Sequence, residues 1–159
     1  MDERFRLSAA RALAPIGRFD RTSAELILEI AYLSIAADRK IDDTEIEAFA
    51  HVGALLVGED GEAKLPAADV NAWLDHFAAR LEVSNLHDRI RAVASELTLE
   101  DARLAAYRIS FFLGIVDLDA SDREFEFDLE LISALHLDQD TADRITSEVN
   151  EALMPPGED

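Results

Sequence analysis

Apolar residues recur every three or four positions along nearly the whole chain, and no stretch keeps the strict alternation of a half-buried strand. One of these apolar stripes consists of Leu26, Ile30, Leu33 and Ala37, and another of Val70, Leu74, Phe77 and Leu81. Such spacing places each stripe on one face of a helix that must pack against another helix. The connections between the stripes are short, so the sequence predicts an all-α bundle of seven or eight helices.

The 159 residues are typical of a single helical domain, which we expect over 1–154. Residues 1–21 are predicted to form an N-terminal helix and its connection to the rest of the domain. Two glycines among charged residues make 58–64 the one clearly loop-like stretch. Two prolines end the last predicted helix, and we expect the tail over 155–159 to fray.

Polar residues ahead of the apolar stripes predict where several helices begin. Thr22 and Glu25 have the spacing of a capping box, in which the threonine hydroxyl accepts the N–H of the glutamate. Ser84 is the predicted cap of a later helix, and either Asp138 or Asp140 begins the last one.

The chain is strongly acidic, with 34 Asp and Glu against 15 Lys and Arg and a net charge of −19. Nucleic acids and anionic membranes bind clustered Lys and Arg, so we expect no nucleic-acid partner and no direct membrane insertion. The densest apolar run, over 111–116, is far shorter than the roughly 20 residues that span a bilayer. The N-terminus lacks the pattern of a secretory signal, so we expect a cytoplasmic protein. The acidity favours cations or a protein partner with a basic surface.

The sequence lacks the common catalytic and metal-binding motifs. Because there is no cysteine, disulfides, thiolate metal sites and a cysteine nucleophile are excluded. No two of the four histidines are three or four residues apart, and there is no serine nucleophile elbow or glycine-rich nucleotide motif. We therefore predict no enzyme and no certain cofactor; a carboxylate pair in an unrecognised cleft is the alternative.

The two halves of the chain resemble each other when the sequence is shifted by 79 residues. Residues 30–56 then align with the second half without gaps, and Asp38 falls on Asp117. Each half contains a long apolar helix, an acidic turn, a capping box and a second apolar helix, in that order. We predict two helical hairpins, over 22–57 and 98–137, related by a pseudo-twofold axis. Independent convergence on the same hairpin pattern is the alternative.

Carboxylates gather in the turn of each predicted hairpin. Asp38 and Asp117 each lie at the predicted C-terminal end of a long helix, where the helix dipole disfavours negative charge. The same unfavourable placement in both halves indicates a functional site, and clustered oxygens bind divalent cations such as Ca²⁺ or Mg²⁺. The candidate metal ligands are Asp38, Asp42 and Glu45 in the first turn, and Asp117, Asp119, Ser121 and Glu124 in the second.

The same carboxylates also have a structural explanation, because acidic residues at a helix start stabilise it. The spacing of an EF-hand calcium loop is not met: counting from Asp117, the sixth residue is Asp122 instead of glycine and the twelfth is Asp128 instead of glutamate. Lys40 brings a positive charge into the first turn, so the second turn is the stronger candidate. Solvated acidic turns without metal are the alternative.

The stretches over 36–45 and 116–124 resemble the paired acidic turns of TerB-like proteins, the tellurite-resistance family. The likeness covers about residues 22–150 and rests on short motifs. It implies an all-helical cytoplasmic domain with internal pseudo-twofold symmetry, without enzymatic activity, in bacterial stress response or tellurite resistance. It also implies cation binding by Asp38, Asp42 and Glu45 and by Asp117, Ser121 and Glu124. The family usually has glycine after each leading aspartate, where this chain has Arg39 and Leu118.

Two further features of the sequence predict possible protein partners. An acidic surface without metal is typical of a protein-interaction or scaffold domain that docks a basic partner. The adjacent Phe111 and Phe112 cannot share one helix face, so one of them faces a neighbouring helix or a second chain, which leaves a homodimer as an alternative. The arginines of the middle stretch pair with the acidic turns, with a partner, or locally. They are Arg89, Arg91, Arg103 and Arg108.

Overall fold

The computed structural model describes residues 3–14, 16, 19–36, 43–56, 67–116 and 123–153, and these contain eight α-helices and no strand. The helices are α1 (Glu3–Ala12), α2 (Arg21–Ala36), α3 (Asp43–Leu56), α4 (Ala67–Glu82), α5 (Leu86–Glu96), α6 (Glu100–Val116), α7 (Arg123–Ala134) and α8 (Gln139–Ala152). The prediction of an all-α helical bundle is confirmed for this part of the chain. None of the described helices combines the length and apolar character needed to cross a lipid bilayer.

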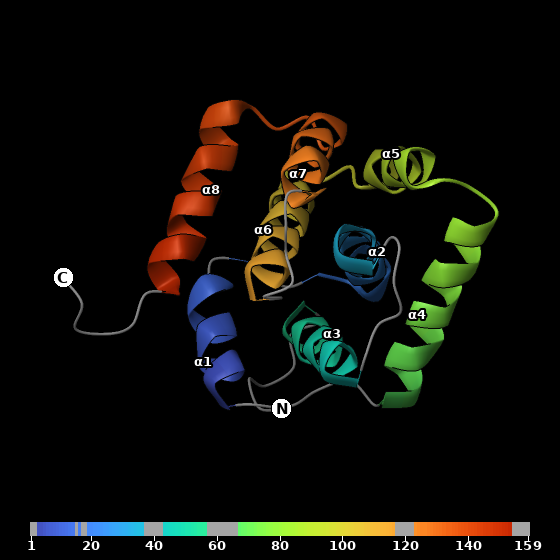
Figure 1. Ribbon diagram of the computed structural model, residues 1–159, viewed down its shortest axis with the longest axis horizontal. Coiled ribbons are helices and arrows are strands. Elements are labelled where there is room, and N and C mark those ends of the chain that lie inside the picture. Colours follow the sequence, from blue (N-terminus) through green and yellow to red (C-terminus); the bar gives the residue numbers. More distant parts are fainter. Residues whose placement is uncertain are drawn as a thin grey trace.

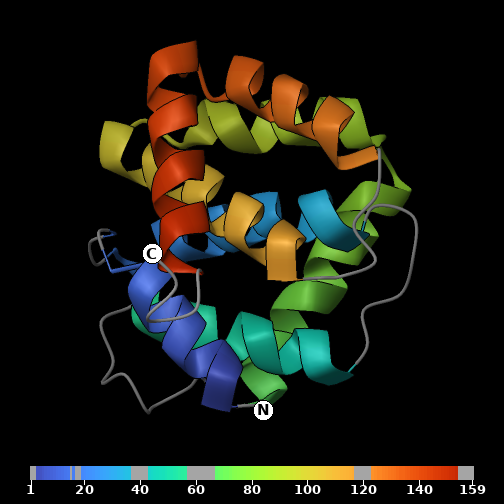
Figure 2. The same ribbon diagram turned by 60° about the vertical axis from the view of Figure 1, so that its left-hand side comes forward.

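Helices α2 and α6 lie side by side at the centre of the bundle and run in the same direction (Figures 1 and 2). On one side, α1 and α8 pack against each other and against α6. On the other side, α4 and α5 pack against α2. Helix α3 contacts both α2 and α4, and helix α7 contacts both α5 and α6. The apolar faces of these elements meet in one core, in which Ile30, Leu33, Ile109 and Phe112 are fully buried.

Both adjacent phenylalanines of α6 pack within the chain itself. Phe112 is fully buried, and Phe111 packs partly buried against the core with its ring stacked on Tyr107 at a centroid distance of 6.4 Å. Packed neighbouring helices therefore account for both rings, and a homodimer stays a prediction.

The boundaries of two helix pairs correspond under the 79-residue shift. Moved by 79 residues, the bounds of α2 become 100–115, against 100–116 for α6. Those of α3 become 122–135, against 123–134 for α7. Two helix–connection–helix units thus have nearly the same lengths. The pseudo-twofold relation between them stays a prediction.

Helix α2 begins before the residue that the sequence indicated. Asp20 caps it, because its Oδ1 accepts a hydrogen bond from the N–H of Ser23 at 3.0 Å. The predicted cap at Thr22 is wrong, since Thr22 lies inside the helix. The side-chain and backbone hydrogen bonds with Ser23 favour the ionised carboxylate and lower the pKa of Asp20.

Two further caps lie at or beside their predicted positions. Asn85, one residue after the predicted Ser84, caps α5 by accepting the N–H of Asp88 at 2.8 Å. Asp138, one of the two predicted alternatives, caps α8 by accepting the N–H of Thr141 at 2.7 Å. The backbone hydrogen bond from Thr141 is the main reason that the pKa of Asp138 is lowered.

The two aspartate caps, Asp20 and Asp138, make the stability of the fold depend on pH. A carboxylate whose pKa is lower in the folded chain stabilises the fold above its unfolded pKa of about 3.9, and this contribution is lost as the pH falls through the folded value. We expect the melting temperature of Asp138→Asn to fall less steeply than that of the wild type between about pH 5 and pH 2, since asparagine accepts the same bond without titrating. Circular dichroism melts at each pH measure this. Asp75→Asn, an exposed change within α4, should keep the wild-type slope. Equal slopes for Asp138→Asn and Asp75→Asn would contradict the expectation.

Helix α7 ends in a left-handed residue that is not glycine. His136 has a φ of 57°, and its N–H donates to the carbonyl of Ser133 at 3.2 Å while the N–H of Leu137 donates to that of Ile132 at 3.1 Å. These two bonds define a Schellman motif, in which glycine is the favoured residue because a Cβ atom clashes there. The histidine therefore costs stability at this position.

Replacing His136 by glycine should stabilise the fold. We expect His136→Gly to raise the free energy of unfolding by about 1 kcal/mol, because the left-handed conformation no longer strains a Cβ atom. Urea unfolding measures the change, provided that the dependence of the free energy of unfolding on urea concentration is the same in both proteins. The matched control is Ala79→Gly, at an exposed position within α4, which should lower the free energy of unfolding by about 1 kcal/mol. A loss of stability in both variants would contradict the strain at His136.

Candidate functional site

The seven predicted metal ligands lie outside the side chains that the structure describes. Five of them fall in the gaps between helices, namely Asp38, Asp42, Asp117, Asp119 and Ser121. Glu45 and Glu124 belong to the first turns of α3 and α7, but their side chains are also outside the described residues. Their role as ligands stays a prediction. Elsewhere, the described ranges contain no group of three or more acidic or histidine side chains placed to hold a metal ion.

A buried charge lies in the middle of α2. Glu29 is fully buried although it stands between Leu28 and Ile30, which belong to the core. Removing a carboxylate from water costs several kcal/mol unless it is paired and hydrogen-bonded. Its partners therefore determine how neighbouring helices can pack against α2.

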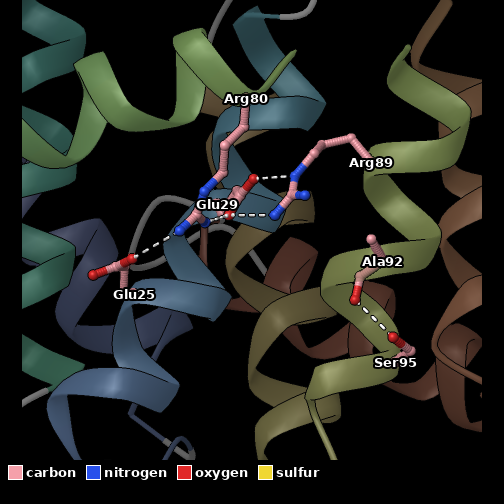
Figure 3. A network of polar contacts seen from close by, with 6 residues as sticks. All are labelled: Glu25, Glu29, Arg80, Arg89, Ala92 and Ser95. Carbon is pink, nitrogen blue, oxygen red and sulfur yellow. Dashed lines mark hydrogen bonds and ion pairs between the residues drawn. The ribbon is translucent and has the colours of Figure 1, made fainter. Parts of the chain in front are cut away.

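Two arginines from two different helices bind this carboxylate (Figure 3). Arg89 of α5 donates from Nε to Oε2 of Glu29 at 2.6 Å and from Nη2 to Oε1 at 3.3 Å. Arg80 of α4 donates from Nη1 to Oε1 at 2.8 Å. Three charge-assisted hydrogen bonds thus connect α2, α4 and α5 at one point.

A second carboxylate of α2 lies one turn earlier and is only loosely held. Oε2 of Glu25 is 4.0 Å from Nη2 of Arg80, and its side chain is 31% exposed. Glu25 and Glu29 are four residues apart on the same helix, where like charges repel each other. The guanidinium of Arg80 between them offsets this repulsion (Figure 3).

A surface groove of about 470 Å³ opens beside this network. It is lined by Thr22, Glu25 and Leu26 of α2, Arg80 of α4, and Arg89 and Glu96 of α5. The groove therefore has charges of both signs and one apolar side chain on its walls.

The opposite side of the bundle contains a second buried charge. Arg108 of α6 is 7% exposed, donates to the carbonyl of Ala12 at 3.3 Å, and forms an ion pair with Glu148 of α8. It thereby connects α6 with α1 and α8. A groove of about 420 Å³ lies next to it, with Asp101 and Arg144 among its lining residues.

Glu29 and Arg108 occupy corresponding positions in the two central helices. The 79-residue shift places Glu29 on Arg108, so each central helix buries one charge at the same point, with opposite sign. Each charge binds peripheral helices, α4 and α5 for Glu29 and α1 and α8 for Arg108. This correspondence concerns side chains that contribute to packing, and it was not part of the sequence alignment.

Three arginines of the middle stretch bind groups of the same chain, and two of them form ion pairs with residues far away in the sequence. Arg89 and Arg108 bind carboxylates of the same chain, and Arg103 donates from Nε to the carbonyl of Leu97 at 2.7 Å. Sequence reasoning missed Glu29 as the partner of Arg89. The available signal was a lone acidic residue at a core position of a largely apolar helix, four residues after another glutamate.

No protein-family model matches the sequence, and no curated protein and no solved structure is significantly similar to it. The resemblance to TerB-like proteins therefore rests on the acidic-turn motifs alone.

Neutralising Glu29 should destabilise the fold severely. We expect Glu29→Gln to lower the free energy of unfolding by about 3 kcal/mol, because two guanidinium groups then lose their buried counter-charge. Glu25→Gln is the matched control on the same helix and should change it by less than about 0.5 kcal/mol, since Glu25 is partly exposed and weakly paired. Urea unfolding of both variants at neutral pH measures the difference. Similar small losses in both variants would contradict the role of Glu29.

Proposed function

We propose that this chain is a non-enzymatic TerB-like module of bacterial stress response or tellurite resistance that binds a divalent cation, Ca²⁺ or Mg²⁺. The binding residues are the acidic side chains that follow α2 and α6 in the sequence. The observation that carries the proposal is the arrangement of these two helices, which are neighbours and run in the same direction (Figure 2).

Parallel neighbours have their C-terminal ends on the same side of the bundle. The C-terminal end of a helix carries a partial negative charge, which favours cations within the last turn. Asp38 and Asp117 follow the last residues of α2 and α6 by no more than two positions. Two helix dipoles thus favour positive charge at one end of the described helices, and an acidic segment follows each of these helices in the sequence. The corresponding helix boundaries support the predicted repeat.

The proposal contains no catalytic step. The charged groups that line the two described grooves include arginines that are already bound by carboxylates of the chain, Arg80 and Arg89 by Glu29 and Arg108 by Glu148. Such pairs fix helices against one another, whereas a general acid or base must be available to a substrate. We place the module in the cytoplasm.

A second candidate function is an acidic interaction domain that docks a basic protein partner without metal. Exposed carboxylates on α8 favour it, since Asp140, Asp143 and Glu151 are all exposed and Arg144 is the one basic residue of that helix. Such a surface attracts a basic partner by long-range electrostatics.

Thermal unfolding after chelator treatment tests the cation proposal. Ca²⁺ or Mg²⁺ at a hundredfold excess over its dissociation constant should stabilise the fold by about 2.7 kcal/mol, which raises the melting temperature by roughly 5 to 10 °C. Asp117→Asn should abolish this increase, and Asp38→Asn reports on the first turn. Asp75→Asn, which removes an equal charge from the exposed part of α4, is the control and should leave the increase unchanged.

Ionic strength is matched with NaCl in every sample, because any cation stabilises a chain of charge −19 by screening. Equal small increases with every divalent ion, unaffected by Asp117→Asn, would contradict a specific site and favour the second candidate function.

A further inference from the structure

The groove beside α2, together with the buried carboxylate behind its wall, carries more negative than positive charge. Glu25 and Glu96 line the groove with Arg80 and Arg89, and both arginines are hydrogen-bonded to Glu29, which is fully buried and does not line it. Glu29 accepts all three hydrogen bonds from the two arginines, whereas Oε2 of Glu25 is 4.0 Å from Nη2 of Arg80. Within the described residues Glu96 has no ion pair. One negative charge on the wall of the groove is therefore uncompensated.

The position of Glu96 in its helix favours a cation at the same point. Glu96 is the last residue of α5, and the last turn of α5 contains no basic residue. The negative end of the helix dipole therefore adds to the negative charge of the carboxylate. A positively charged group in the groove would be attracted both by the carboxylate of Glu96 and by the negative end of the α5 dipole. It would thereby offset the repulsion between these two, which lowers the stability of the free chain.

We propose that this groove receives a lysine or arginine side chain presented by a basic segment of a partner protein. Its charged group binds between Glu25 and Glu96, and its methylene groups lie against Leu26. The inference rests on the second candidate function and assigns the docking site to residues of α2, α4 and α5.

The charge and the ligands of the groove select this occupant. A single positive charge restores neutrality, and the net charge of −19 attracts a basic segment from a distance. A metal ion would need clustered oxygen ligands, but the described residues contain no group of three that could hold one. An anion would compete with Glu29 for Arg80 and Arg89, and Glu29 is fully buried and cannot be displaced without exposing the core.

Nuclear magnetic resonance titration of the ¹⁵N-labelled chain tests the inference. The probe is the blocked peptide acetyl-Gly-Lys-Gly-amide, with acetyl-Gly-Glu-Gly-amide as its charge-reversed control, at constant ionic strength. We expect saturable shifts of backbone amides around Leu26 and Glu96 with the lysine peptide alone. Glu96→Gln should weaken binding about threefold, as expected for loss of one partly exposed ion pair.

The matched control is Glu151→Gln, an exposed glutamate of α8, which should leave the affinity unchanged. Glu96→Gln is compatible with folding, because it removes an unfavourable charge from the end of α5. Saturable shifts on α8 that Glu151→Gln weakens and Glu96→Gln does not would overturn the groove while supporting a basic partner. Absence of saturable shifts with the lysine peptide would overturn both the groove and the docking of basic side chains, and neither result bears on the cation proposal.

Discussion

The buried carboxylate of Glu29 is the interaction on which the positions of α4 and α5 against α2 depend. A charge in the core is tolerated only when its hydrogen bonds are satisfied, and Glu29 obtains them from Arg80 and Arg89. These arginines belong to α4 and α5, so both helices must approach α2 at defined points. The groove that we propose as a docking site is a consequence, because its walls are the three helices that meet at Glu29.

Arg108 plays the corresponding part on the other side of the bundle. It connects α6 with α1 and α8, as Glu29 connects α2 with α4 and α5. The two central helices thus each bury one charge at equivalent positions, while the sign of the charge and the partner helices differ.

Sequence reasoning predicted the helices well, because helical periodicity is a local signal that core burial reinforces. The three caps that the structure describes were predicted within two residues. Asp20 and Asn85 were missed because neighbouring polar residues offer competing caps with the same chemistry. The network around Glu29 was out of reach, since its partners are 51 and 60 residues away in the sequence. The acidic turns were identified from local sequence patterns, as the helices were. Whether their side chains surround a metal ion depends on side-chain positions, which a sequence pattern does not give.

Native-state amide hydrogen exchange of Glu29→Gln beside the wild type tests most directly whether Glu29 fixes α4 and α5. If it does, the amides of α4 and α5 lose protection in the variant at low denaturant and open together, while those of α6 and α8 keep the protection set by global unfolding. Equal loss of protection in all helices, or unchanged protection in α4 and α5, would show that these helices are held by apolar packing and not by the buried carboxylate.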